Sequence, residues 1–223
     1  MSKQFVLNLG WIVGAALLGF AITTVFAGVF RLPRSLFLVA YLILAAPFLY
    51  GFMRWSHLSI AELIRHNWIW GLVGAALVGA FMVRNILSQP ASPHSHGLAL
   101  AFDVAWLGAV YGALDALFLS VLPVLATLQA FSAIGWTRTP GEKILVGAIA
   151  LVASLFVTVA YHVGFPEYRT TGAIMGPSIG NGVMSLGYLL TNNPISAVFS
   201  HIAMHVAGVL QGPATVMQLP PHY

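Results

Sequence analysis

The stretch LALAFDVAWLGAVYGALDALFLSVLPVLATLQAF, residues Leu98–Phe131, decides the fold class of this chain. It runs for 34 residues and contains two ionisable side chains, Asp103 and Asp115. As a single helix it would be about 51 Å long, which exceeds the roughly 30 Å hydrocarbon core of a bilayer. We therefore predict a membrane-embedded segment that is broken or kinked. The candidate break points are Gly108, Gly112 and Pro123.

The rest of the chain has the same composition. Of its 223 residues, 59% are hydrophobic and 6% are charged, and the mean hydropathy is +0.91. Soluble domains carry about 25% charged residues, so we expect one integral membrane domain over residues 1–223, with the lipid bilayer as its partner. The nine Lys and Arg residues are scattered singly, which excludes a nucleic-acid partner. The absence of cysteine excludes disulfides and thiolate metal sites.

Hydrophobic runs on either side of Leu98–Phe131 predict an all-α, polytopic transmembrane bundle of six to seven spans. Residues 53–68 mix charged and apolar residues and predict an interfacial amphipathic helix. Residues 166–180 are polar and rich in Gly and Pro, and predict a connection or a re-entrant loop; residues 211–223 predict a tail. The other predicted spans are Phe5–Phe30, Ser35–Phe52, Ile69–Leu87, Ile144–Phe165, the short Asn181–Leu190, and Pro194–Leu210. A cleaved signal peptide is the alternative for the first span, although its apolar run is long for one.

Two histidines on the last span have the spacing of metal ligands. His201 and His205, in the sequence HIAMH, are four residues apart and so lie on one face of a helix. A helix can offer two nitrogens to one metal with this spacing. The alternative is that each histidine forms a hydrogen bond with a neighbouring helix.

Two further ionisable residues in apolar chain could complete a site with these histidines. His162 and Asp115 would allow a closed tetrahedral zinc site, or a catalytic site that retains a water. The alternative for Asp115 is a structural hydrogen bond to Tyr111 or Tyr161, whereas Asp103 lies near a loop. A shared site requires a span from about residue 110 to 131, because otherwise Asp115 and His162 would lie at opposite membrane depths.

The order of these residues resembles the CAAX-protease and bacteriocin-processing (CPBP/Abi) family of intramembrane metalloproteases, over residues 110–210. The sequence YLLTNNPISAVFSHIAMHVAGVL is similar to the family's last motif, with His201 at the ligand position and His205 where Asn is usual. The sequence TVAYH, ending at His162, keeps the histidine of the FxxxH motif. Of the EExxxR motif only one acid remains, as Asp115.

The resemblance implies a divergent protease of a prokaryotic cell membrane that hydrolyses membrane-associated peptides. His162, His201 and His205 would bind a divalent metal, with zinc expected, and Asp115 and His205 would be catalytic. No glutamate lies in a predicted span, and Asp115 places its carboxylate about 1 Å short, a displacement that can cost on the order of 10²-fold in rate. The alternatives are a non-catalytic scaffold or a metal- or haem-holding subunit of a membrane complex. A transporter is less well supported, because no inverted repeat is visible.

Overall fold

A computed structural model describes residues 2–222, and all regular secondary structure in this range is helical. Five helices are long and apolar enough to cross a membrane, which confirms the all-helical class and indicates a membrane protein. These helices span Lys3–Val29, Arg34–Ser56, Trp68–Leu87, Gly97–Ser132 and Pro140–Val163. The elements in chain order are α1 (Lys3–Ile22), η1 (Thr23–Val29), α2 (Arg34–Ser56), α3 (Ile60–Arg65), α4 (Trp68–Leu87), α5 (Gly97–Asp103), η2 (Val104–Val110), α6 (Tyr111–Asp115), η3 (Ala116–Val121), α7 (Leu122–Ser132), α8 (Pro140–Val163), η4 (Pro166–Tyr168), α9 (Thr171–Thr191) and α10 (Ile195–Gln211).

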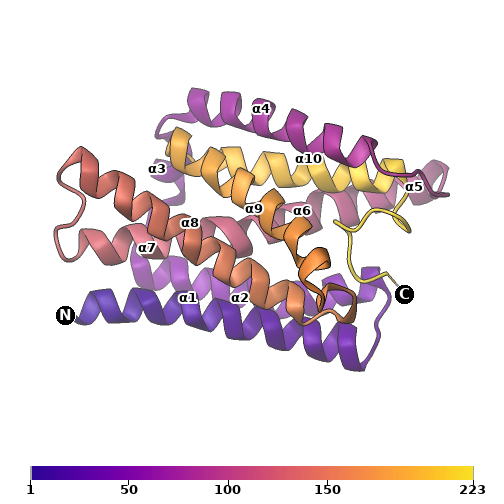
Figure 1. The fold of residues 1–223 in the computed structure, drawn as a ribbon, viewed down its shortest axis with the longest axis horizontal. Coiled ribbons are helices and arrows are strands. Elements are labelled where there is room, and N and C mark those ends of the chain that lie inside the picture. Colours follow the sequence, from indigo (N-terminus) through magenta and orange to yellow (C-terminus); the bar gives the residue numbers. More distant parts are fainter. Residues whose placement is uncertain (1, 223) are drawn as a thin grey trace.

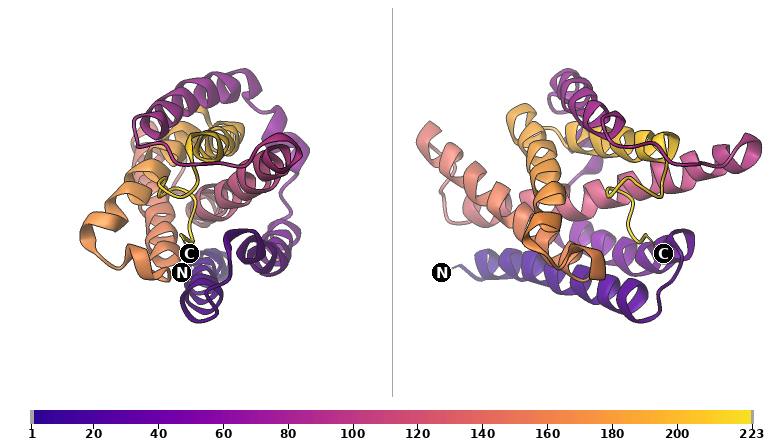
Figure 2. Two further views of the ribbon diagram at one scale, coloured as in Figure 1. Left: turned by 90° about the vertical axis from the view of Figure 1, so that its right-hand side faces the viewer. Right: turned by 45° about the vertical axis from the view of Figure 1, so that its right-hand side comes forward.

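The long helices run through the bundle in alternating directions. In Figure 1, four helices run from left to right: α1, α4, α8 and α10. Three run from right to left: α2, the continuous helix from α5 to α7, and α9. The helix from α5 to α7 is the central one. In its most apolar stretch of 18 residues, 78% of the residues are buried, against 28–39% in the corresponding stretches of the other four long helices. Its first part, α5, has no buried residue and projects beyond the other helices (Figure 2), so the buried part lies toward α7.

The central helix is continuous, so the predicted break in this segment is wrong, whereas the alternative of a kink stays a prediction. It continues from Gly97 to Ser132 through two π-helical segments, η2 and η3. Pro123 removes the N–H that would normally bond to the carbonyl of Leu119. That carbonyl instead accepts hydrogen bonds from Ser154 Oγ (2.7 Å) and Asn181 Nδ2 (3.4 Å) on neighbouring helices. The freed backbone group is therefore satisfied from outside, and the helix tolerates the proline.

The predicted connection at residues 166–180 is also wrong for most of its length. After the short η4, Thr170 caps a single helix, α9, by accepting a bond from the Ala173 N–H at 3.3 Å. This helix passes through Pro177 and ends at Thr191, so it includes the short predicted span 181–190. The glycines and proline that suggested a loop are accommodated because α9 packs against α8, α4 and α10.

Small residues bring the central helix close to α10. A Cβ on Gly112 would lie 2.8 Å from Ile202 Cα, and one on Gly108 would lie 3.2 Å from Val206 Cα. Both distances are below ordinary van der Waals contact, so only glycine permits this approach. The contact fixes α6, which ends at Asp115, against the helix that carries His201 and His205.

Candidate functional site

The four predicted site residues line one cavity inside the bundle. Asp115 is the last residue of α6, His162 lies near the end of α8, and His201 and His205 lie on α10. All four are buried and border a cavity of about 40 Å³. Asp115 and His162 therefore lie at the same depth, as a shared site requires.

Two of the histidines are held by their own helices. His162 Nδ1 lies 2.8 Å from the Thr158 carbonyl oxygen, and His201 Nδ1 lies 3.1 Å from that of Ala197. A carbonyl oxygen can only accept, so each Nδ1 carries the proton and each neutral ring keeps its lone pair on Nε2. Proteins orient histidines for metal or water binding in the same way.

Asp115 pairs with the third histidine. Its Oδ2 lies 3.3 Å from His205 Nε2, and both side chains are almost completely buried. Within residues 2–222, Asp115 Oδ1 and both ring nitrogens of His205 have no hydrogen-bond partner, so the Asp115–His205 contact is a close charge pair and not a hydrogen bond. A buried carboxylate oxygen without a partner is costly, so this oxygen is suited to accept a hydrogen bond from a molecule in the cavity.

The tyrosines that could have bonded to Asp115 have other partners. Tyr111 Oη donates to the Pro220 carbonyl oxygen at 3.0 Å, and Tyr161 Oη lies 3.0 Å from Tyr111 Oη. Because the Tyr111 proton is used at Pro220, Tyr161 is the donor to Tyr111. Their rings also fix the histidines edge-on: Tyr111 lies 4.9 Å from His205 and Tyr161 lies 5.1 Å from His162, between ring centroids. The pair therefore positions the imidazoles and does not use its hydroxyl protons on Asp115.

The side chains of His162, His201 and His205 do not form the predicted metal site in their observed positions. Among residues 2–222, no three His, Asp or Glu side chains are grouped closely enough to hold one ion. Zinc at His162, His201 and His205 stays a prediction. Asp103, the other acid in the central helix, accepts a hydrogen bond from Ser95 Oγ in the loop before α5 at 2.6 Å and does not line the cavity.

Sequence reasoning missed a polar network that borders the cavity. Asn181 lines the cavity, and its Nδ2 donates to Ser154 Oγ (2.8 Å) and Thr158 Oγ1 (2.6 Å). Its Oδ1 accepts from Ser120 Oγ at 2.6 Å, and Ser185 bonds to both serines. The four-residue spacings 154/158 and 181/185 place each pair on one helix face, and this signal was available in the sequence.

The C-terminal tail also contributes to the site. It folds back over the end of the bundle after α10, as the yellow trace in Figure 1 shows. Gln218 lines the cavity, and its Oε1 accepts a bond from Gln89 Nε2 at 3.2 Å. Val216 and Leu219 are fully buried, and Tyr168 Oη donates to the Met217 carbonyl oxygen. The tail therefore forms one wall of the cavity.

No protein-family model, curated protein or solved structure matches this chain. What the site can do is set by its own groups. These are two histidines with free Nε2 lone pairs, an aspartate–histidine pair, and a small cavity between them that has both polar and apolar walls.

Proposed function

We propose that this protein is an intramembrane hydrolase that cleaves peptides within the bilayer, as a divergent relative of the CPBP/Abi family. One observation carries the proposal: Asp115, His162, His201 and His205 border a single buried cavity. A charged aspartate at the bilayer centre costs at least about 2.5 kcal/mol, and histidines are also rare in membrane spans, so four such side chains that share one cavity need a common reason. Activation of a water molecule would give each of these four side chains a role.

The chemistry follows from the side chains alone. A cavity of about 40 Å³ has room for one to three waters, at about 10–15 Å³ each. Such a water would donate one hydrogen to the Nε2 lone pair of His162 or His201 and the other to Asp115 Oδ1. The Asp115–His205 pair would take its proton as the oxygen attacks a peptide carbonyl carbon, and would return the proton to the departing amine nitrogen. We assign no step to a metal, because three ligands are not grouped.

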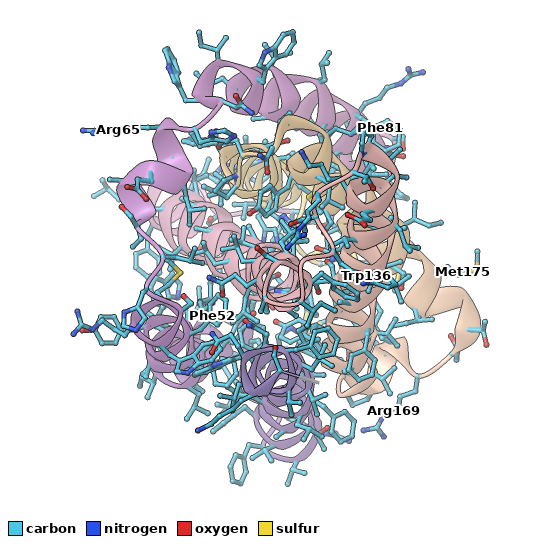
Figure 3. The ribbon with its side chains drawn as sticks, turned by 90° about the vertical axis from the view of Figure 1, so that its left-hand side faces the viewer. Phe52, Arg65, Phe81, Trp136, Arg169 and Met175 are labelled. Carbon is cyan, nitrogen blue, oxygen red and sulfur yellow. The ribbon has the colours of Figure 1, made fainter. Side chains whose placement is uncertain are left out.

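The cavity is too small for a peptide, so the substrate must enter through a wall that moves. We propose that α9 and α10 also cross the membrane, which gives seven spans, and that α9 forms the entrance. Gly176, Pro177 and Gly180 of α9 line the cavity, whereas Met175 and Ile179 on the same helix are exposed. Figure 3 shows Met175 at the outer edge of the molecule. A shift of this half of α9 would open the cavity sideways to the lipid.

A non-catalytic scaffold is the second candidate. It is favoured by Asp115 in place of the family's glutamate and by the tail, which contributes Gln218 to the cavity wall. Small residues such as Gly74 and Gly79 of α4 permit close packing between subunits, but here they pack within the chain and so do not support a scaffold. A Cβ on Gly74 would lie 2.7 Å from Ser196 Oγ, and one on Gly79 would lie 3.6 Å from Ala203 Cβ.

The test compares purified wild-type protein with Asp115→Asn and His162→Ala in a bilayer that contains a library of labelled transmembrane peptides. Cleavage by wild type that both variants lose supports hydrolysis. His94→Ala, in the loop before α5, is the control and should cleave as wild type does. Metal analysis of wild type, His162→Ala and His201→Ala tests the zinc prediction separately. Folded wild-type protein that cleaves nothing would favour the scaffold.

A further inference from the structure

Two cavities meet at the short helix α3, away from the Asp115 site. The first, of about 450 Å³, lies between α2, α3, the central helix and the start of α10, and apolar or aromatic side chains line it throughout. Ile60 and Ile64 of α3 form one side, and Leu122 and Val198 form the other. Ile60 and Phe199 at its edge are exposed, so the groove opens on the outer surface of the bundle.

The second cavity, of about 420 Å³, combines apolar side chains with a group of polar ones, for which we call it the polar chamber. It lies on the other side of α3 and is bordered by Ser59, Glu62, His66, Gln129, Ser132 and Asn192. Leu63 and Leu125 line both cavities, so the apolar and polar chambers share a wall. An apolar groove beside a polar chamber matches the two parts of an amphiphile.

The polar chamber presents acceptors that need a cationic donor. Gln129 Nε2 donates to the Ser56 carbonyl oxygen at 3.4 Å, which sets the orientation of the amide. Gln129 Oε1 is buried and has no partner within residues 2–222. Glu62 brings a carboxylate to the same chamber. An acidic group and an unpartnered carbonyl oxygen together favour an ammonium group, which carries only donors.

A hydrogen-bond donor lies in the same chamber. His66 Nε2 accepts from Asn192 Nδ2 (3.0 Å) and Asn67 Nδ2 (3.2 Å), so the ring proton is on Nδ1. This N–H can donate to an anionic oxygen. The chamber therefore offers partners for both charges of a zwitterionic headgroup.

The walls of the two chambers are held in place by Asn193. Its Nδ2 donates to the carbonyl oxygens of Leu63 (3.2 Å) and Ile64 (3.0 Å) at the end of α3, and also to that of His66. Its Oδ1 accepts from the N–H of Ile195 at 2.8 Å, at the start of α10. Because α3 is tied to α10 in this way, the chambers exist before any ligand binds.

We propose that these chambers bind a phospholipid with an ethanolamine headgroup. One acyl chain would lie in the apolar groove, and the ammonium would donate to the Glu62 carboxylate and Gln129 Oε1. The phosphate would accept from His66 Nδ1. The proposal requires that the chain lies in a bilayer and is independent of hydrolysis at Asp115.

The experiment measures lipid binding to the purified full-length protein by native mass spectrometry. The probes are dioleoyl phosphatidylethanolamine, phosphatidylcholine and phosphatidylglycerol, which share their acyl chains and differ in their headgroups. Wild type should retain the ethanolamine lipid most strongly. Glu62→Gln should weaken that binding about tenfold, as expected for the loss of a charged hydrogen-bond partner.

Two further variants separate the parts of the site. Arg65→Gln changes a charge on the same helix turn but lines neither chamber, and Figure 3 shows Arg65 pointing away from the bundle, so its binding should match wild type. Val198→Trp fills the groove and should weaken all three lipids; Ile195→Phe is the milder substitute if it fails to fold. Equal retention of the three lipids by wild type, or unchanged binding by Glu62→Gln, would overturn the proposal.

Discussion

Replacing Gly112 by alanine should push apart the two helices that carry the Asp115–His205 pair. The added Cβ would lie 2.8 Å from Ile202 Cα and 2.9 Å from the His201 carbonyl oxygen, whereas ordinary contact begins at 3.4 Å. The obstacles are backbone atoms, which cannot rotate away as the end of a side chain can. The central helix and α10 must therefore separate locally by about 0.6 Å, the shortfall from ordinary contact.

This displacement has a predictable size of effect. The 3.3 Å contact between Asp115 and His205 would lengthen to about 4 Å, the limit for an ion pair. Since a misplacement of 1 Å can cost on the order of 10²-fold in rate, a shift of 0.6 Å should cost roughly tenfold. Overpacking of a tight contact should also lower the free energy of unfolding by about 1–3 kcal/mol.

The matched control is Gly147→Ala on α8, where an added Cβ meets nothing within 4 Å. This variant should keep wild-type activity and be slightly stabilised, by about 0.4–1 kcal/mol, since alanine restricts the unfolded chain. The measurements are thermal unfolding in detergent and peptide cleavage in a bilayer. If Gly112→Ala unfolds at the same temperature and cleaves at the same rate as Gly147→Ala, the argument from close approach is wrong.

Three other perturbations test separate parts of the structure. Gly180→Ala should be tolerated, because the added Cβ would meet only the terminal methyl of Met82, at 3.1 Å. Gly180→Leu should fill the cavity and abolish peptide cleavage without unfolding the protein. Full cleavage activity of the leucine variant would contradict this prediction. Asn181→Leu removes the centre of the polar network. It should lower the free energy of unfolding by about 1–3 kcal/mol for each polar group left unpaired. Thermal unfolding in detergent measures this, and an unchanged unfolding temperature would argue against a stabilising network. Burial and the neighbouring Arg34 guanidinium lower the pKa of His222 from its usual 6.5, against a smaller opposing effect of Glu167, so the neutral ring favours the docked tail. Docking of the tail should be complete above pH 6.5 and weaken as the pH falls below it. Hydrogen exchange of the tail amides should therefore become faster at low pH in wild type but not in His222→Asn.

The sequence was most informative where local spacing controls geometry. The HxxxH spacing is sufficient to place His201 and His205 on one face, and the length of the central segment allowed Asp115 to reach the depth of His162. Membrane character followed from composition alone. These inferences needed no knowledge of which helices pack together.

The failures all involve partners distant in sequence. Pro123 suggested a break because the groups that satisfy the Leu119 carbonyl lie on α8 and α9. The glycines and Pro177 of α9 suggested a loop because nothing local shows that neighbouring helices stabilise that segment. Gln218 could not be predicted as a site residue, because a polar, proline-containing tail gives no sign that it folds back onto a cavity.

The π-helical segments of the central helix affect how relatives of this chain should be aligned. A π turn holds one residue more than an α turn, so η2 and η3 each accommodate a surplus residue while the flanking turns keep their faces. A relative with a regular α-helix here would be one residue shorter at each segment. Its equivalents of Asp115 and Pro123 would coincide with these positions only if single-residue gaps were allowed inside a membrane helix.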